Sequence, residues 1–184
     1  MTIRHILWGS ATVILALIIH FCAVLAIPLV SENDAWKRLQ NFTKVNEMLI
    51  VNSVTEANRL WAFHAPDMSF AICRYDVTKG PVQVDFELLR GYWSVAIYDP
   101  DGKNFYAADG FDFVRQETSL LLLGPDHIKG DNDALPINVP NEEGLLVLRA
   151  PFDNPVMKQT VINMLNRAKC DQIQVETVKP RKTT

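Results

Sequence analysis

Residues 92–107 read YWSVAIYDPDGKNFYA, and this stretch decides the fold class. Its first part, Tyr92–Tyr98, is rich in residues that favour β-strands, and its alternating side chains predict one buried face. The turn Asp99–Gly102 follows, in which proline presets φ and glycine permits the tight exit. Because residues 103–107 then return as a second strand, the stretch predicts a β-hairpin. Its buried face is expected to carry Trp93, Val95 and Ile97.

Four further segments extend the β pattern in both directions. Val82–Leu88 alternates apolar with polar residues, as a half-buried strand does, and Gln172–Val178 alternates again. Thr118–Leu123 and Leu145–Arg149 are short apolar runs bounded by glycine or proline, which is typical of buried strands. Residues 124–143 are rich in Asp, Asn, Gly and Pro and predict one long loop. The pattern therefore favours a mainly β (α+β) class, an antiparallel β-sandwich-like domain with flanking helices.

Two helices are predicted to flank the strands. The first begins at Ser31, which suits an N-cap and has an acidic residue three positions on. Its apolar residues recur at roughly helical spacing and are Ala35, Trp36, Leu39, Phe42 and Leu49. Thr55–Phe63 fits a short additional helix. The second flanking helix begins at Asn154, with Pro155 at the first helical position. The apolar stripe of the second helix consists of Met157, Val161, Met164, Leu165 and Ala168.

The N-terminal segment Ile6–Val30 contains no Lys, Arg, Asp or Glu. As a helix it exceeds the roughly 30 Å thickness of a bilayer core, which predicts one transmembrane span. The alternative is a cleaved signal peptide ending at Val24-Leu25-Ala26, but the apolar region of such a peptide covers only about 7–15 residues. We therefore expect an anchor at residues 1–30 and a domain at residues 31–184. Arg4 favours a cytoplasmic N-terminus, which puts that domain outside the cytoplasm.

Charge and motif content argue against several classes of function. The chain has 18 basic and 21 acidic residues and a net charge of −3, which argues against binding nucleic acid. Phosphate-binding loops, dinucleotide motifs and nucleophile elbows are absent from the sequence, so we expect no cofactor. The domain has only two histidines, His64 and His127, which are too few for a three-histidine zinc site. Asp109–Asp112 and Asp131–Asp133 lack the spacing of a calcium loop, so we expect no metal.

Residues 71–76 read Ala-Ile-Cys-Arg-Tyr-Asp, and Gly80-Pro81, Tyr92-Trp93-Ser94 and Tyr98-Asp99 follow them. Together these motifs resemble the bacterial domain of unknown function 1254 family, most of all its short, membrane-anchored members. The resemblance covers residues 65–150 and implies a β-sandwich-type domain on the outer side of the bacterial inner membrane. Longer members carry an Asp-Thr-x-Tyr signature, which this sequence replaces, so the resemblance implies no catalytic residue.

Polar residues gather where two predicted strands end. Arg74, Tyr75 and Asp76 end one strand, and Tyr98 and Asp99 end another. If these ends meet, an Arg, two carboxylates and two phenols would line a cleft suited to an anionic or sugar-like ligand. The alternative is an Arg–Asp pair that pins a loop.

The predicted domain contains two cysteines, Cys73 and Cys170, whereas Cys22 lies within the predicted span. An oxidising compartment permits disulfides, so the two thiols of the domain predict one bridge. Cys73 lies on a predicted strand and Cys170 at the predicted end of the last helix, so the bridge would tie the C-terminal unit to the sheet. The alternative is a pair of buried thiols that pack as small apolar side chains.

Three hypotheses about function follow. The first is a protein anchored in the bacterial inner membrane, whose periplasmic domain binds an envelope partner or a small ligand without catalysis. The second is an envelope hydrolase or isomerase with an Arg/Asp/Tyr cleft. The third is an accessory subunit that docks into a larger membrane complex through its span. Because the sequence shows no nucleophile–base pattern, the first hypothesis is preferred.

Overall fold

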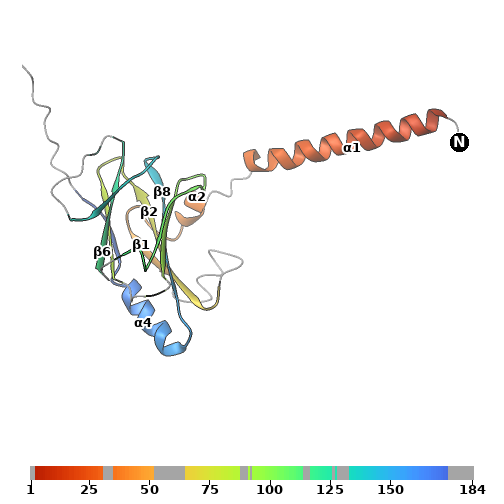
Figure 1. The fold of residues 1–184 in the computed structure, drawn as a ribbon. Helices are drawn as coiled ribbons and strands as arrows, with labels where there is room; N and C mark the ends of the chain where they lie inside the picture. The colour runs from red at the N-terminus through yellow and green to blue at the C-terminus, as the bar shows by residue number, and fades with distance from the viewer. Residues whose placement is uncertain are drawn as a thin grey trace, which may run out of the picture. The chain divides into compact units, whose positions relative to one another are not determined.

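The computed structural model describes residues 3–30, 35–51, 65–87, 91, 93–113, 117–125, 127 and 133–173. The chain divides into two compact units, Met1–Asp34 and Ala35–Thr184. Helix α1 (Ile3–Val30) makes up the described part of the first unit, and the second unit holds the other described helices and strands (Figure 1).

Helix α1 is long and apolar enough to cross a membrane, over residues Ile3–Ile27. Nearly all of its described side chains are exposed, as expected for a helix whose apolar surface contacts lipid rather than protein. A signal sequence near an N-terminus has the same length and composition. The predicted apolar helix is therefore present, and both the anchor and the signal peptide are compatible with it.

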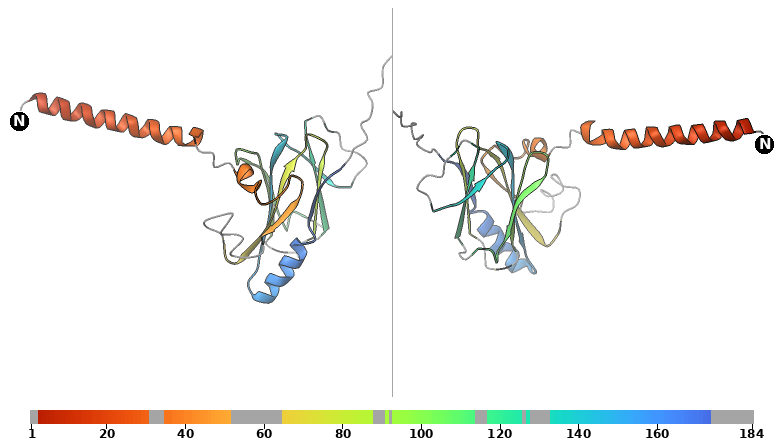
Figure 2. Two further views of the ribbon diagram at one scale, coloured as in Figure 1. Left: turned by 180° about the vertical axis from the view of Figure 1, so that it is seen from behind. Right: turned by 45° about the horizontal axis from the view of Figure 1, so that its top comes forward.

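Two β-sheets face each other in the second unit and form a sandwich (Figures 1 and 2). The antiparallel five-stranded sheet has the order β1 (Met48–Val51), β2 (Met68–Asp76), β8 (Glu143–Pro151), β4 (Ser94–Tyr98) and β5 (Asn104–Asp109). The four-stranded sheet has the order β7 (Leu135–Asn138), β6 (Glu117–Leu123), β3 (Val82–Glu87) and β9 (Lys169–Gln172). The predicted β-sandwich-like fold class is confirmed.

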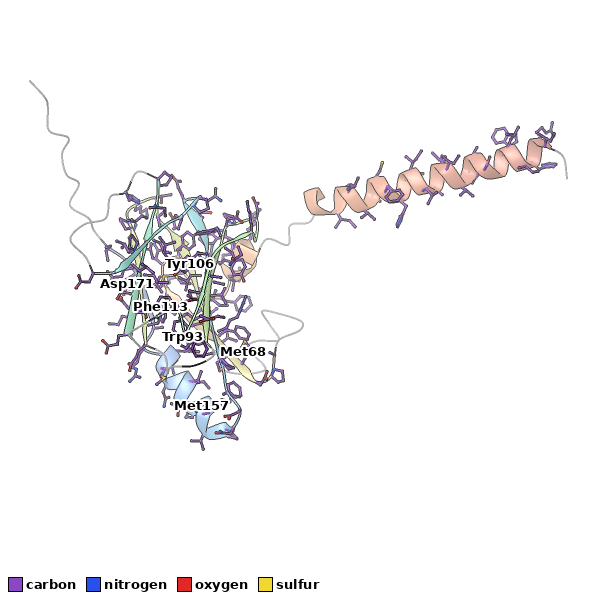
Figure 3. All side chains as sticks on the ribbon, in the orientation of Figure 1. Met68, Trp93, Tyr106, Phe113, Met157 and Asp171 are labelled. Atoms are coloured by element: carbon purple, nitrogen blue, oxygen red, sulfur yellow. A yellow bond between two sulfur atoms is a disulfide. The ribbon has the colours of Figure 1, made fainter. Side chains whose placement is uncertain are left out.

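The core lies between the two sheets and takes alternate residues from their strands. On β3 the buried residues are Val82, Val84 and Phe86, which is the face that the sequence predicts. Trp93 stacks on Phe113 with a centroid distance of 5.2 Å, and both side chains are labelled in Figure 3. Phe86 meets Trp93 edge to face at 5.3 Å. Such aromatic contacts add to the stabilisation that burial of these large side chains provides.

Helix α4 (Pro155–Leu165) lies at one end of the sandwich and contacts β2, β3 and β8 (Figures 1 and 2). Its start is as predicted, because the Asn154 side chain accepts a hydrogen bond of 2.8 Å from the backbone N–H of Met157. Pro155 occupies the first helical turn. Val161 and Leu165 are buried and connect the helix to the core.

The first flanking helix is much shorter than the predicted one. Helix α2 (Ala35–Leu39) ends at Leu39, and Leu49 lies on strand β1 instead. Phe42 is exposed, and Asn46 adopts a positive φ of 57°, which a continuing helix does not allow. The prediction of one longer helix is therefore wrong, because its apolar residues belong partly to a short helix and partly to a strand. The predicted cap Ser31 and the helix at 55–63 lie outside the described residues.

Two strand predictions also need correction. Strand β7 lies inside the predicted loop 124–143 and pairs parallel with β6, so the four-stranded sheet is mixed. Its Pro136 fits an edge strand, where one side of the backbone needs no partner. Because proline within a segment argues against a strand, the sequence pattern predicted a loop here. Strand β9 begins at Lys169 rather than Gln172, so Cys170 lies on a strand and not at a helix end.

Candidate functional site

The strand ends that carry the predicted site lie together at the end of the five-stranded sheet where β2 and β4 finish. This border of strand ends is here called the edge. Strands β2 and β4 each pair with β8 in antiparallel orientation, so they run in the same direction and end at the same edge. Arg74 and Tyr98 pair with Leu145 from its two sides. The two strand ends are therefore separated by the single strand β8.

The site residues divide between the two faces of this sheet, because successive side chains on a strand point to opposite faces. Tyr75 points into the core and has no exposed surface. Arg74 and Tyr98 lie on the outer face, beside a second apolar cluster that includes Trp36 and Leu39 of α2. The five side chains are thus brought to one edge, but they do not share one face.

Arg74 connects α2 to the sheet. It is only 5% exposed, and its guanidinium carbon lies 4.2 Å from the ring centroid of Trp36. Its Nη1 donates a hydrogen bond of 3.2 Å to the carbonyl oxygen of Thr43. A desolvated cation on an indole face is a stabilising contact, so Arg74 holds residues 36–43 against the outer face of the sheet.

The two carboxylates hold turns. Asp76 accepts hydrogen bonds from the backbone N–H of Thr78 at 2.8 Å and from its hydroxyl at 2.6 Å. Asp99 accepts a hydrogen bond of 2.8 Å from the backbone N–H of Lys103, which closes the turn of the predicted hairpin. The bonds from the two backbone N–H groups are the local side-chain-to-backbone contacts by which Asp favours turns.

Tyr75 reaches across β8 toward Asp99. It pairs directly with Gly144, and a Cβ atom at Gly144 would collide with the Tyr75 ring and with the Tyr98 carbonyl oxygen. Burial, and secondly the Asp99 carboxylate, raise the pKa of Tyr75 above its usual value of 10.0. Among the described residues, its hydroxyl has no hydrogen-bond partner. Tyr75 therefore lies close to the end of β4, which Asp99 directly follows.

We expect stability of the β-domain to fall as the pH rises above about 10, in part because of Tyr75. Since folding raises the Tyr75 pKa, its contribution is complete below the unfolded-state pKa and is lost as the pH rises through the folded-state pKa. Tyr75→Phe removes this contribution, and urea unfolding of the solubilised chain at about pH 8 and about pH 11 measures it. The variant is expected to lose less stability than the wild type. An equal loss in both proteins would show that Tyr75 does not titrate with unfolding.

Arg149 also lies on the outer face of the five-stranded sheet and was not predicted from the sequence as a site residue. Its Nη2 donates a hydrogen bond of 2.7 Å to the hydroxyl of Tyr98. The signal that would have found it is the alternation along β8, which places Leu145, Val147 and Arg149 on the same face as Tyr98.

A second polar group on the other sheet was also missed. On β3 the side chains between the buried residues are polar, and Gln83 donates to both carboxylate oxygens of Asp85 at 2.9 and 3.0 Å. The hydroxyl of Ser119 on β6 donates a short hydrogen bond to the same carboxylate. This group ties two neighbouring strands together on the outer face of the four-stranded sheet. The sequence signal for this polar group is the set of polar residues that alternate with the apolar ones in Val82–Leu88.

Cys73 and Cys170 form a disulfide across the sandwich. Cys73 lies on β2 of one sheet and Cys170 on β9 of the other, and their Cα atoms are 6.3 Å apart. Both residues are buried, whereas Cys22 is free and lies on α1. The bond joins the last described strand to the five-stranded sheet.

Within the described residues, no three His, Cys, Asp or Glu side chains gather as a group able to hold a metal ion. The loop Asp109–Asp112 is closed by its own contacts, since the two Asp side chains accept from backbone N–H groups of that loop at 2.8 and 2.9 Å. His127 accepts a hydrogen bond of 3.2 Å from the backbone N–H of Gly124. His64 and residues 131–132 lie outside the described part.

Three comparisons place the chain among known proteins. The family model for proteins of unknown function DUF1254 matches residues 45–172. The fold resembles the VPA0106 protein from Vibrio parahaemolyticus, with a TM-score of 0.60 and 15% identity over 82% of this chain and 40% of that one. An uncharacterized protein from Burkholderia cenocepacia matches with a TM-score of 0.45 and 12% identity, over 82% and 42% of the two chains. This chain thus spans less than half the length of either structure. A search of the curated proteins finds no match.

Proposed function

The chain belongs to the DUF1254 family of proteins of unknown function, and we propose that it is a single-span protein of the bacterial envelope. In this proposal α1 is the anchor, retained in the inner membrane. Residues 31–184 are the periplasmic domain, which binds an envelope partner or a small ligand without catalysing a reaction.

The observation that carries the proposal is the disulfide Cys73–Cys170 in a domain that follows an exposed apolar helix. Disulfides persist in oxidising compartments such as the periplasm and are rare in the cytosol. The helix supplies a means of export and of retention at the membrane. Each feature favours the same location, and the two are independent of each other.

The contacts of the polar residues favour binding over catalysis. Both candidate carboxylates already accept hydrogen bonds that hold turns, and Arg74 is buried against Trp36. A general base must be free to accept a proton from a substrate, which these two side chains are poorly placed to do. Asp76 and Tyr98 remain partly exposed, whereas Arg74, Tyr75 and Asp99 are buried. A partner at this edge would therefore contact Asp76 and Tyr98, with the buried three as their support.

A photo-crosslinking residue tests binding at this edge. Lys79 is exposed in the turn after β2, close in sequence to Asp76, and Val156 is exposed on α4 and serves as the matched control. In living cells of the source bacterium, we expect the crosslinker at position 79 to give an adduct of discrete mass that position 156 does not give. The same pattern at both positions, or no adduct at position 79, would contradict binding at this edge.

A further inference from the structure

We propose that residues 35–46, here called the juxta-anchor segment, form a lipid-contacting surface of the β-domain. Phe42 and Val45 rest on the membrane interface, and Lys37 and Lys44 attract anionic phospholipid headgroups. This inference rests on the proposed role of α1 as a retained membrane anchor.

The first half of the juxta-anchor segment is fixed to the domain. Trp36 and Leu39 are buried in the apolar cluster on the outer face of the five-stranded sheet. After α2 ends, the backbone N–H groups of Phe42 and Thr43 donate to the carbonyl oxygen of Leu39 at 2.9 and 3.0 Å. The position of Phe42 is therefore set by the fold of the domain.

The second half is fixed by strand β2. Val45 forms an isolated parallel bridge with Arg74, and the backbone N–H of Asn46 donates to the Arg74 carbonyl oxygen at 2.8 Å. The Asn46 side chain donates to the Asp76 carbonyl oxygen at 3.0 Å and accepts from the Asp76 N–H at 2.8 Å. Asn46 thus pairs with the backbone of Asp76 as a strand residue would. The segment is therefore held against the domain at both of its ends, although it contains little regular structure.

Two apolar side chains project from this fixed segment into solvent. Phe42 is 43% exposed and Val45 is 39% exposed. The basic side chains of Lys37 and Lys44 are exposed beside them in the sequence. The juxta-anchor segment itself contains no Asp or Glu, and its acidic neighbours in the sequence are Glu32, Asp34 and the exposed Glu47. The partly exposed Asp76 lies next to Asn46 through its backbone. A pairing of exposed apolar and basic side chains is typical of surfaces that lie in a membrane interface.

The chain itself indicates which surface would cover these residues. Helix α1 ends at Val30 and α2 begins at Ala35, so the four residues 31–34 separate them. A segment this close in sequence to an inserted helix emerges at the headgroup region, where amphipathic segments bury Trp, Phe and Leu side chains. Anionic headgroups attract basic residues within a Debye length of the surface. Sequence position, charge and exposed apolar area therefore favour the same occupant, a lipid surface with anionic headgroups.

Site-specific quenching in the full chain tests the inference. In a Cys22→Ser background the disulfide leaves no free thiol, so Phe42→Cys, Val45→Cys or Val156→Cys can each be labelled alone with an environment-sensitive fluorophore. Val156, which is 78% exposed on α4, is the matched control for an exposed apolar position. The labelled chains are reconstituted into vesicles of phosphatidylcholine, with or without phosphatidylglycerol, that contain a lipid-borne quencher.

We expect several-fold stronger quenching at positions 42 and 45 than at position 156 in the vesicles that contain phosphatidylglycerol. Quenching should weaken without the anionic lipid and in a Lys37→Glu, Lys44→Glu background. Equal quenching at positions 42 and 156, or quenching that ignores lipid charge, would overturn the inference. A carbonate wash before the measurement separates the two proposals. A chain released by carbonate overturns the anchor and this inference with it, whereas a retained chain with an unquenched probe overturns the inference alone.

Discussion

Replacing Cys73 and Cys170 together by alanine is expected to lower the free energy of unfolding of the β-domain by about 4–5 kcal/mol. The disulfide joins residues 97 positions apart, so its removal frees a large loop in the unfolded chain. Such a loss is a large share of the roughly 5–15 kcal/mol that holds most domains folded. Urea unfolding of the solubilised chain, followed by near-UV circular dichroism, measures it.

Cys22→Ala is the matched control for this prediction. Cys22 is free and exposed on α1, outside the unit that contains the sandwich, so its replacement should leave the unfolding of the β-domain unchanged. Treatment of the wild type with a reductant should reproduce most of the loss seen in the double variant. A loss below about 1 kcal/mol would mean that the sandwich holds its last strand without the bond.

Gly144→Ala is expected to destabilise the β-domain by about 3 kcal/mol, the upper part of the usual range for overpacking. A Cβ atom at this position would collide with both the Tyr75 ring and the Tyr98 carbonyl oxygen. The carbonyl oxygen belongs to the backbone of β4, an interior strand that pairs with both β8 and β5, so its movement would disturb strand pairing. Chemical unfolding of the variant measures the effect.

A double-mutant cycle with Tyr75→Leu identifies the cause. If the Tyr75 ring is the principal obstacle, Gly144→Ala should cost clearly less in the Tyr75→Leu background, because the shorter side chain leaves room for the new methyl group. Additive effects of the two substitutions would show that the Tyr98 carbonyl oxygen, and not the Tyr75 ring, is the principal obstacle.

Local patterns predicted the parts of the fold that local chemistry determines. The hairpin around Asp99–Gly102 forms as expected, because its turn residues and its alternating strand act over neighbouring positions. The start of α4 at Asn154 was also predictable, since an N-cap and a following proline are local signals. The alternation in residues 82–87 gave the buried face of β3 correctly.

Features that depend on distant partners were predicted less well. Strand β7 exists because it adds to the edge of β6, which no pattern within residues 124–143 reveals. Helix α2 ends early because Val45 and Asn46 pair with β2, about thirty residues away in the chain. Strand β9 begins at Lys169 because it pairs with β3.

The candidate site shows the same division. The sequence predicted that Arg74–Asp76 and Tyr98–Asp99 end two strands, and the structure places these ends at one edge. It did not predict that Arg74 would be buried by Trp36, because this contact needs the packing of α2 on the sheet. The separation of Arg74 and Tyr75 onto opposite faces follows from strand alternation alone. The sequence pattern predicted one cleft if the strand ends met, but strand alternation alone puts neighbouring site residues on opposite faces.

The central claim is that α1 anchors a β-domain that lies outside the cytoplasm, and topology reporters at the C-terminus test it most directly. A fusion of alkaline phosphatase after Thr184 should be active, and a fusion of a fluorescent protein that matures only in the cytoplasm should be dark. Deleting residues 3–30, the whole of α1, should reverse both signals and serves as the control. An inactive phosphatase together with a bright fluorescent fusion of the intact chain would place the domain in the cytoplasm and contradict the account.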